Sequence, residues 1–301
     1  MEETEIATEN KSNPFKSLIA GGVGGMCMVL VGYPLDTIKV RLQTMPTPLP
    51  GQSPRYKGVV DCTARIFRQE GFRGFCKGIS APLMAVTPIF AVDLAVYAAV
   101  KRFFQKDDRV AITYPQIFIA GAVAGVCTGL VTVPSDRIKI LLQTQSVSKG
   151  PQLYHGTMDT AIKLYKQGGI RSLFKGTCAC ILKESPTGIY YVTYEFLQEL
   201  ARKNSKTGQI SATSTILSGG TAGIVFWTLA VPFDVLKSRL QSAPEGTYKH
   251  GIRSVFRDLM ATEGPKALFR GSVPILLLAF PTVAAFFSGV ELTNALLKSK
   301  T

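Results

Sequence analysis

Long apolar stretches of 25 residues or more alternate along the chain with shorter polar ones. A helix of about 20 residues, rising about 1.5 Å per residue, crosses the hydrocarbon core of a membrane. The apolar stretches run over 14–43, 78–104, 114–143, 176–200, 211–241 and 271–297. The pattern therefore predicts an all-α membrane protein with six transmembrane helices.

Between the first and second stretch of each pair lies a shorter amphipathic segment. These segments cover 59–69, 158–166 and 252–262, and each follows a Tyr-x-Gly or Tyr-x-x-Gly turn that ends at Gly58, Gly156 or Gly251. Their apolar residues recur at helical spacing. We expect three short helices that lie on one face of the bundle.

A polar motif closes the first stretch of each pair. It reads Pro-x-Asp-x-x-Lys with a Gln nine residues after the proline, and it occurs three times at a period of about 100 residues. The copies contain Asp36, Lys39 and Gln43, then Asp136, Lys139 and Gln143, then Asp234, Lys237 and Gln241. Repeats in register indicate copies of one structural unit. The predicted units are residues 14–108, 112–203 and 211–298.

A second motif, an acid and Gly followed by a base and Gly, precedes the second stretch of each pair. Glu70-Gly71 is followed by Lys77-Gly78, and Glu263-Gly264 by Arg270-Gly271. The middle copy has Gly168-Gly169 before Lys175-Gly176 and lacks the acid. Pro34 is expected to bend the first stretch. Pro134 and Pro232 hold the same place in the other two copies, and a lone proline, 88, 186 or 281, follows each basic-Gly pair.

Composition changes the picture little. The chain has 301 residues, 46% of them apolar, and a net charge of +14; its mean hydropathy is +0.20. The basic residues lie between apolar segments and form no patch interleaved with aromatic residues, so contact with anionic lipid explains the charge better than nucleic acid does.

Catalytic signatures are absent from the sequence. There is no nucleophile elbow, no metal-ligand cluster and no dinucleotide-binding loop, and the six cysteines lack the spacing of a disulfide framework. The acidic start, Met1 to Glu5, lacks the Arg-rich pattern of a cleaved presequence. We expect neither an enzyme nor a bound cofactor.

The triplicated motifs resemble the mitochondrial carrier family over almost the whole chain. The first repeat, from Gly32-Tyr33-Pro34 through Leu49-Pro50-Gly51-Gln52, is similar to the carnitine/acylcarnitine carriers of that family. The resemblance implies a monomer in the mitochondrial inner membrane, with six helices around a pseudo-threefold axis and the short helices on the matrix side. It also implies solute transport by alternating access.

The acid and base of each proline motif lie three residues apart, so an ion pair within one helix is one interpretation. The resemblance implies another, a ring of pairs between repeats that forms a matrix gate. Its pairs are Asp36 with Lys139, Asp136 with Lys237, and Asp234 with Lys39, and Gln43, Gln143 and Gln241 are expected to brace them. The motif for a gate on the cytosolic side is degraded at Tyr97, Glu195 and Glu291, so we expect the resting carrier to open toward the cytosol.

The basic-Gly pairs precede helices whose free N–H groups suit a phosphate. The resemblance names that phosphate as part of cardiolipin, with the short-helix starts as the facing partners. The predicted lipid-binding residues are Gly58, Lys77, Gly78, Gly156, Lys175, Gly176, Gly251, Arg270 and Gly271. Lysines that extend along apolar surface to reach water are the alternative.

The resemblance places the cargo site just before the prolines of the second stretches. The residues there are Ala85, the charged neighbours Lys183 and Glu184, and Leu278. Leu278 stands where the carnitine carriers have an arginine. Asp93 lies in the apolar run 91–100, where an acid marks either a functional site or an interhelical hydrogen bond.

Two cargoes remain open. A carnitine-like zwitterion, favoured by the first repeat, would place its carboxylate on Lys183 and its ammonium by Glu184. A cation, either a basic amino acid or Mg²⁺, is the alternative, because Asp93 and Glu184 outnumber Lys183 and Mg²⁺ is held by one or two carboxylates and water.

Overall fold

The computed structural model describes residues 14–45, 53–105, 112–145, 153–205 and 210–298. The described residues form helices and no strand. In chain order the elements are α1 (Pro14–Gln43), α2 (Val59–Glu70), η1 (Phe72–Cys76), α3 (Ser80–Phe104), α4 (Tyr114–Thr144), α5 (Thr157–Leu173), α6 (Thr177–Glu184), α7 (Thr187–Asn204), α8 (Ala212–Ser242), α9 (Ile252–Thr262), η3 (Pro265–Phe269) and α10 (Ser272–Lys298).

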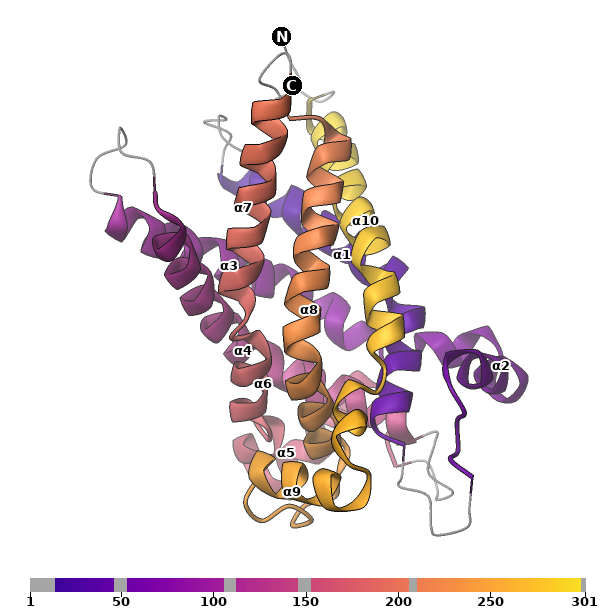
Figure 1. Ribbon diagram of the computed structural model, residues 1–301. Coiled ribbons are helices and arrows are strands. Elements are labelled where there is room, and N and C mark those ends of the chain that lie inside the picture. Colours follow the sequence, from indigo (N-terminus) through magenta and orange to yellow (C-terminus); the bar gives the residue numbers. More distant parts are fainter. Residues whose placement is uncertain (1–13, 46–52, 106–111, 146–152, 206–209, 299–301) are drawn as a thin grey trace.

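The long helices close into a ring. Each contacts the next in the order α1, α3, α4, α6 with α7, α8 and α10, and α10 returns to α1. Figure 1 shows α7, α8 and α10 side by side along the long axis of the molecule. The ring matches the all-α architecture that the hydropathy pattern predicts.

Among the described residues, five helical stretches are long and apolar enough to cross a membrane. They are Ile19–Gln43, Phe72–Phe104, Tyr114–Thr144, Ala212–Ser242 and Pro265–Leu296. The expected sixth helix, 176–200, is instead two helices, α6 and α7, separated by Ser185 and Pro186. Proline lacks the N–H that the helix ladder requires and clashes with the preceding turn. The other five motif prolines lie inside continuous helices.

The short helices pack at one end of the ring, which is called the short-helix end here. Apolar residues near the ends of α1, α4 and α8 form one buried cluster each with α2, α5 and α9. Figure 1 shows α5 and α9 at the bottom and α2 at the lower right. The end of each proline-motif helix is thereby held by the short helix that follows it.

The segment that follows the short helix differs between the repeats. In repeats 1 and 3, α2 and α9 end at Glu70 and Thr262 and are followed by 3₁₀ turns. In repeat 2, where 158–166 was expected, α5 runs to Leu173 with non-helical angles at Gly168 and Gly169. Without the acid that precedes Gly in the other copies, helical structure resumes directly after the kink.

Glycines on α4 bring α6 and α7 close. A Cβ at Gly125 would lie 2.7 Å from the carbonyl oxygen of Glu184, and one at Gly121 would lie 2.7 Å from the ring of Tyr191. Small residues allow this approach between helices in a membrane. The contact sets the position of Glu184 and Tyr191 in the ring.

Candidate functional site

The charged residues of the proline motifs meet at the short-helix end. Each acid contacts the lysine of a different repeat, and the three pairs close a cycle over α1, α4 and α8. The pairs are Lys39 Nζ with Asp234 Oδ2 at 2.9 Å, Lys237 Nζ with Asp136 Oδ2 at 2.5 Å, and Lys139 with Asp36 in direct contact. The alternative pairing within one helix is also present but longer, at 3.8 Å from Lys39 to Asp36 and from Lys237 to Asp234.

The three ion pairs, called the ion-pair ring here, are buried unevenly. The side chains of Asp234 and Lys237 are 3% and 5% exposed, whereas that of Asp36 is 18% exposed. Removing one partner of a buried pair costs about 3–5 kcal/mol because the other charge stays buried and uncompensated. The ion pairs at Asp234 and Lys237 should therefore cost the most to separate.

Only one of the three predicted glutamine braces contacts a ring carboxylate. Gln43 donates to Asp234 Oδ2 at 2.8 Å and accepts from Ser238. Gln143 instead donates to the Thr37 hydroxyl at 3.0 Å, and Gln241 donates to the Lys175 carbonyl at 3.2 Å. The expectation that each glutamine braces an ion pair is wrong for Gln143 and Gln241, because each amide meets a different residue on the neighbouring element.

A second set of ion pairs lies at the same short-helix end, in repeats 1 and 3. In repeat 1, Glu70 binds Arg41 through both carboxylate oxygens and lies 2.6 Å from Lys77 Nζ. In repeat 3, Glu263 Oε1 lies 2.6 Å from Arg239 Nη1, and its other oxygen contacts Arg270. Each pair joins the proline-motif helix to the short helix of its own repeat.

Sequence reasoning noted Glu70 and Glu263 but missed their arginine partners. The available signal was an arginine seven residues after the motif proline, which is Arg41 in repeat 1 and Arg239 in repeat 3. Repeat 2 has Leu141 at that position. The arginine and the acid are thus present together or absent together.

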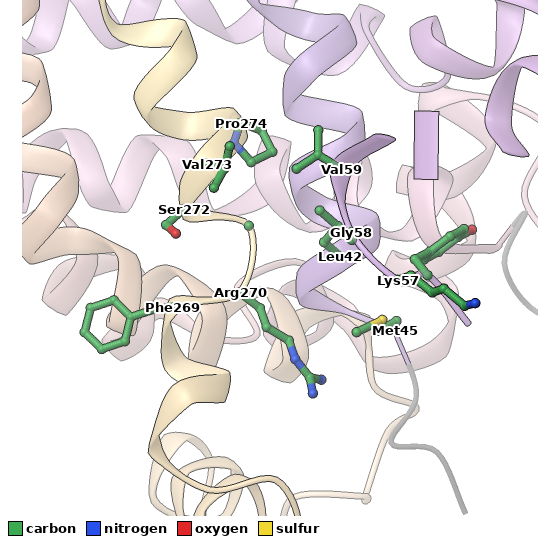
Figure 2. A pocket seen from close by; sticks show the side chains of 12 residues that line it. Leu42, Met45, Lys57, Gly58, Val59, Phe269, Arg270, Ser272, Val273 and Pro274 are labelled. Atoms are coloured by element: carbon green, nitrogen blue, oxygen red, sulfur yellow. The ribbon is translucent and has the colours of Figure 1, made fainter. Parts of the chain in front are cut away.

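Predicted lipid-binding residues line two pockets. One of about 260 Å³ is lined by Gly58 on one side and by Arg270 and Gly271 on the other (Figure 2). The other, of about 140 Å³, is lined by Lys77, Gly78 and Gly156, among others.

The basic side chains at these sites are held by the protein itself. Lys77 and Arg270 pair with the acids of their own repeats. Lys175 donates to the Ala243 carbonyl at 2.7 Å. Gly176, which follows Lys175, lies against Gln241, and Gly251 precedes α9.

The charged neighbours of the predicted cargo site pair with each other. Lys183 Nζ lies 2.5 Å from Glu184 Oε1, and their side chains are 12% and 16% exposed. The Trp227 ring lies 5.4 Å from Lys183 Nζ and 4.3 Å from Lys39 Nζ. Trp227, for which the sequence left open whether it lines the cavity or faces lipid, thus contacts both Lys183 and a lysine of the ion-pair ring.

The other predicted cargo residues lie on three different helices and make contacts of their own. Leu278 on α10 packs beside Gly32 of α1, and Ala85 is half-buried on α3. Asp93 on α3 accepts a hydrogen bond of 2.5 Å from the Tyr191 hydroxyl on α7. The Tyr191 ring stacks on that of Tyr97 with 4.1 Å between centroids.

The interhelical hydrogen bond that sequence reasoning left open for Asp93 is therefore present. Its partner is a phenol, which carries no positive charge. Sequence reasoning missed Tyr191 as the partner, because the pairing joins two helices from different repeats.

Three segments of the chain, residues 10–108, 111–205 and 208–301, match the family described as mitochondrial carrier protein. The chain belongs to the mitochondrial carrier family. It is a multi-pass protein of the mitochondrial inner membrane with a role in transport. This confirms the resemblance seen in the triplicated motifs.

The names of two relatives of this carrier state different cargoes, and the name of a third states none. It is 81% identical to mitochondrial magnesium exporter 1 of Drosophila melanogaster over 299 residues, which are 99% of this chain and 100% of that protein. It is 47% identical to protein dif-1 of Caenorhabditis elegans, over 94% of this chain and 92% of that one. It is 45% identical to the carnitine/acylcarnitine carrier of Rattus norvegicus, over 95% of each chain.

Proposed function

We propose that this carrier moves a cation, Mg²⁺ first, across the inner membrane by alternating access. The relative named as a magnesium exporter is 81% identical to it, whereas the carnitine/acylcarnitine carrier of the rat is 45% identical. The cargo that the first repeat suggested, a carnitine-like zwitterion, thus becomes the second candidate.

The Asp93 environment is the observation that carries the proposal. Asp93 accepts a hydrogen bond from the Tyr191 phenol, and no base among the described residues pairs with it, so a bound cation would supply the missing positive charge. Glu184 is balanced by Lys183, and Leu278 supplies no base. Two acids against one base favour a cation, and Mg²⁺ is commonly bound by one or two carboxylates with its waters retained.

The ring of ion pairs would then be the matrix gate. The short-helix end is the matrix side in this proposal, and its three pairs close that side. A gate works only if cargo binding shifts the balance between closed and open states. Trp227 lies against both Lys183 and Lys39, so a cation that draws Glu184 away from Lys183 changes the surroundings of a ring lysine.

Purified carrier in liposomes that contain a Mg²⁺-sensitive dye tests the cargo. Wild type should carry Mg²⁺, and Asp93→Asn should lower the flux at least about tenfold, because the residue loses its charge but keeps its shape. Glu199→Gln is the matched control, since Glu199 is an exposed acid of α7 that pairs with Lys203; its flux should stay near wild type. Absence of Mg²⁺ flux in the wild type would refute the cation proposal.

The carnitine candidate is tested in the same vesicles. It is supported by the 45% identity to the rat carrier and by the adjacent Lys183 and Glu184. Carnitine exchange should be absent in wild type, and Leu278→Arg should reduce Mg²⁺ flux by adding a positive charge. Carnitine exchange by the wild type would favour the second candidate.

Charge reversal tests the gate between repeats. Asp36→Lys should abolish most transport, because three bases would then crowd one side of the ring. Adding Lys139→Asp should partly restore it. A double variant no better than either single one would contradict the pairing as a gate.

For the lipid sites we propose cardiolipin at the two pockets. Cardiolipin should raise the unfolding temperature of the purified carrier, since a ligand of the folded state stabilises it. Gly271→Ala should weaken this rise, because Gly271 has φ of +79° and a Cβ there would lie 3.2 Å from the Lys39 carbonyl oxygen. An equal rise in the two proteins would argue against this pocket.

A further inference from the structure

Glu245 lies in the turn after α8, in repeat 3, and its carboxylate faces repeat 2. Its Oε1 is 3.1 Å from Arg137 Nη2 on α4 and 3.7 Å from Lys175 Nζ. The Ser172 hydroxyl donates to the same oxygen at 3.5 Å. One oxygen thus meets three donors, and all three belong to another repeat.

The turn itself is fastened to the same place. Lys175 Nζ donates to the carbonyl of Ala243 at 2.7 Å and to that of Pro244 at 3.2 Å. Gly246, directly after Glu245, has φ of +81° and reverses the chain there. Residues 243–245, called the strap here, therefore lie against repeat 2.

Arg137 depends on this strap. Its side chain is 3% exposed, and its Nε and Nη1 atoms find no hydrogen-bond partner within the described residues. The acid that repeats 1 and 3 carry before their Gly is Gly168 in repeat 2. Loss of Glu245 would leave the buried Arg137 guanidinium without its carboxylate, at a modest cost because the Glu245 side chain is 57% exposed to solvent.

We propose that Glu245 is a second latch on the matrix side, supplied to repeat 2 by repeat 3. Glu70 and Glu263 pair with arginines of their own repeats and move with them. Glu245 moves with α8, whereas Arg137 moves with α4. When these helices part and Lys237 leaves Asp136, Glu245 must leave Arg137 as well, so it biases the resting carrier toward the matrix-closed state. The inference rests on the proposed alternating access and on no particular cargo.

The native Cys180 can report opening without any cargo. It is 1% exposed, and its sulfur lies 3.6 Å from the Gln241 amide next to the ring. The full-length carrier, with Cys180 as its sole cysteine, is placed in lipid nanodiscs and treated with a maleimide well below its unfolding temperature. The rate of labelling then measures how often the matrix side opens.

Glu245→Gln should raise the labelling rate by at least about fivefold. The substitution removes the carboxylate that Arg137 contacts in the closed state, whereas in the open state this contact is already broken, so only the closed state is destabilised. Glu70→Gln is the matched control, since its pair lies within one repeat. It should lower the unfolding temperature and leave the labelling rate within about twofold of the parent, as expected for a pair that moves as one body.

A third variant separates a latch from a simple stabilising contact. Adding Gly168→Glu to Glu245→Gln returns an acid to repeat 2 itself, where position 168 lies against Ser172. The unfolding temperature should recover while labelling stays fast. Labelling that is unchanged by Glu245→Gln, equally raised by Glu70→Gln, or slowed to the parent rate by Gly168→Glu would overturn the proposal. Because the assay contains no cargo, failure of Mg²⁺ transport would leave its result intact.

Discussion

Repeats 1 and 3 hold their short-helix ends with an acid of their own, and repeat 2 does not. Glu70 and Glu263 each join an arginine of the proline-motif helix to the base before the next long helix. In repeat 2 the arginine position is Leu141 and the acid position is Gly168. Leu141 packs into the apolar cluster between α4 and α5.

The difference shows that the repeats share backbone geometry more closely than charge. Gly71, Gly169 and Gly264 have φ of +65°, +62° and +74°, so all three copies turn alike. A buried pair is costly to break one partner at a time, whereas an apolar replacement of both partners can be neutral. Repeat 2 fits that replacement and takes its acid from repeat 3.

The largest effect should come from Glu263→Gln. The side chain of Glu263 is 2% exposed and binds two arginines, so removing its charge should cost about 3–5 kcal/mol of folding free energy. Glu245→Gln, at a residue whose side chain is 57% exposed, should cost less than about 1 kcal/mol. Thermal unfolding in nanodiscs measures both.

Asp258 offers a control for that comparison. It is a surface acid of α9 that accepts a hydrogen bond of 3.3 Å from the Tyr248 hydroxyl, and Asp258→Asn should leave stability within about 0.5 kcal/mol. Equal losses for Glu263→Gln and Glu245→Gln would show that the two acids are equivalent, against the comparison drawn from burial.

A smaller effect is expected when repeat 2 is given the pair of its neighbours. Leu141→Arg alone should destabilise the carrier, because it buries a charge in an apolar cluster. Adding Gly168→Glu should recover about 1–3 kcal/mol, the range of coupling between contacting residues. A double-mutant cycle measures the recovery, and purely additive losses would mean that repeat 2 can no longer accept the pair.

The smallest effect concerns the loss of folding stability at low pH. Burial alone would raise the pKa of Glu70, but hydrogen bonds from Arg41 and Lys77 outweigh it and hold the pKa below its usual value. The stabilisation is complete above the unfolded-state pKa of about 4.3 and is lost as pH falls through the lower folded-state value. Glu70→Gln should therefore flatten the loss of stability below about pH 4.3. Repeat 2 has Gly168 at this position, so Gly168→Ala should leave the decrease in stability at low pH unchanged.

Much of the ring was predictable from the repeats. Apart from the sixth span and the end of α5, the long and short helices were expected within a few residues of where they lie, because hydrophobic periodicity and turn residues act locally. The family resemblance supplied the partners of Asp36, Asp136 and Asp234. Spacing alone left an ion pair within one helix open, and the structure contains that contact too at 3.8 Å.

Other features depend on contacts between helices that are far apart in the sequence. The break of the sixth span at Pro186 was hidden because five similar prolines leave their helices continuous. Gln43 reaches a carboxylate while Gln143 and Gln241 do not, since each meets a different neighbour. The Tyr191 partner of Asp93 is 98 residues away in the chain.

The helices, their threefold repetition and the acid and base in each proline motif follow from periodicity and short spacings, so local sequence is enough to predict them. Which charges meet depends instead on how the helices pack. Arg137 and Glu245 are 108 residues apart and belong to no shared motif. They pair because a buried guanidinium must find a carboxylate wherever the fold brings one within reach, and that distance is set by the packing of α4 against α8.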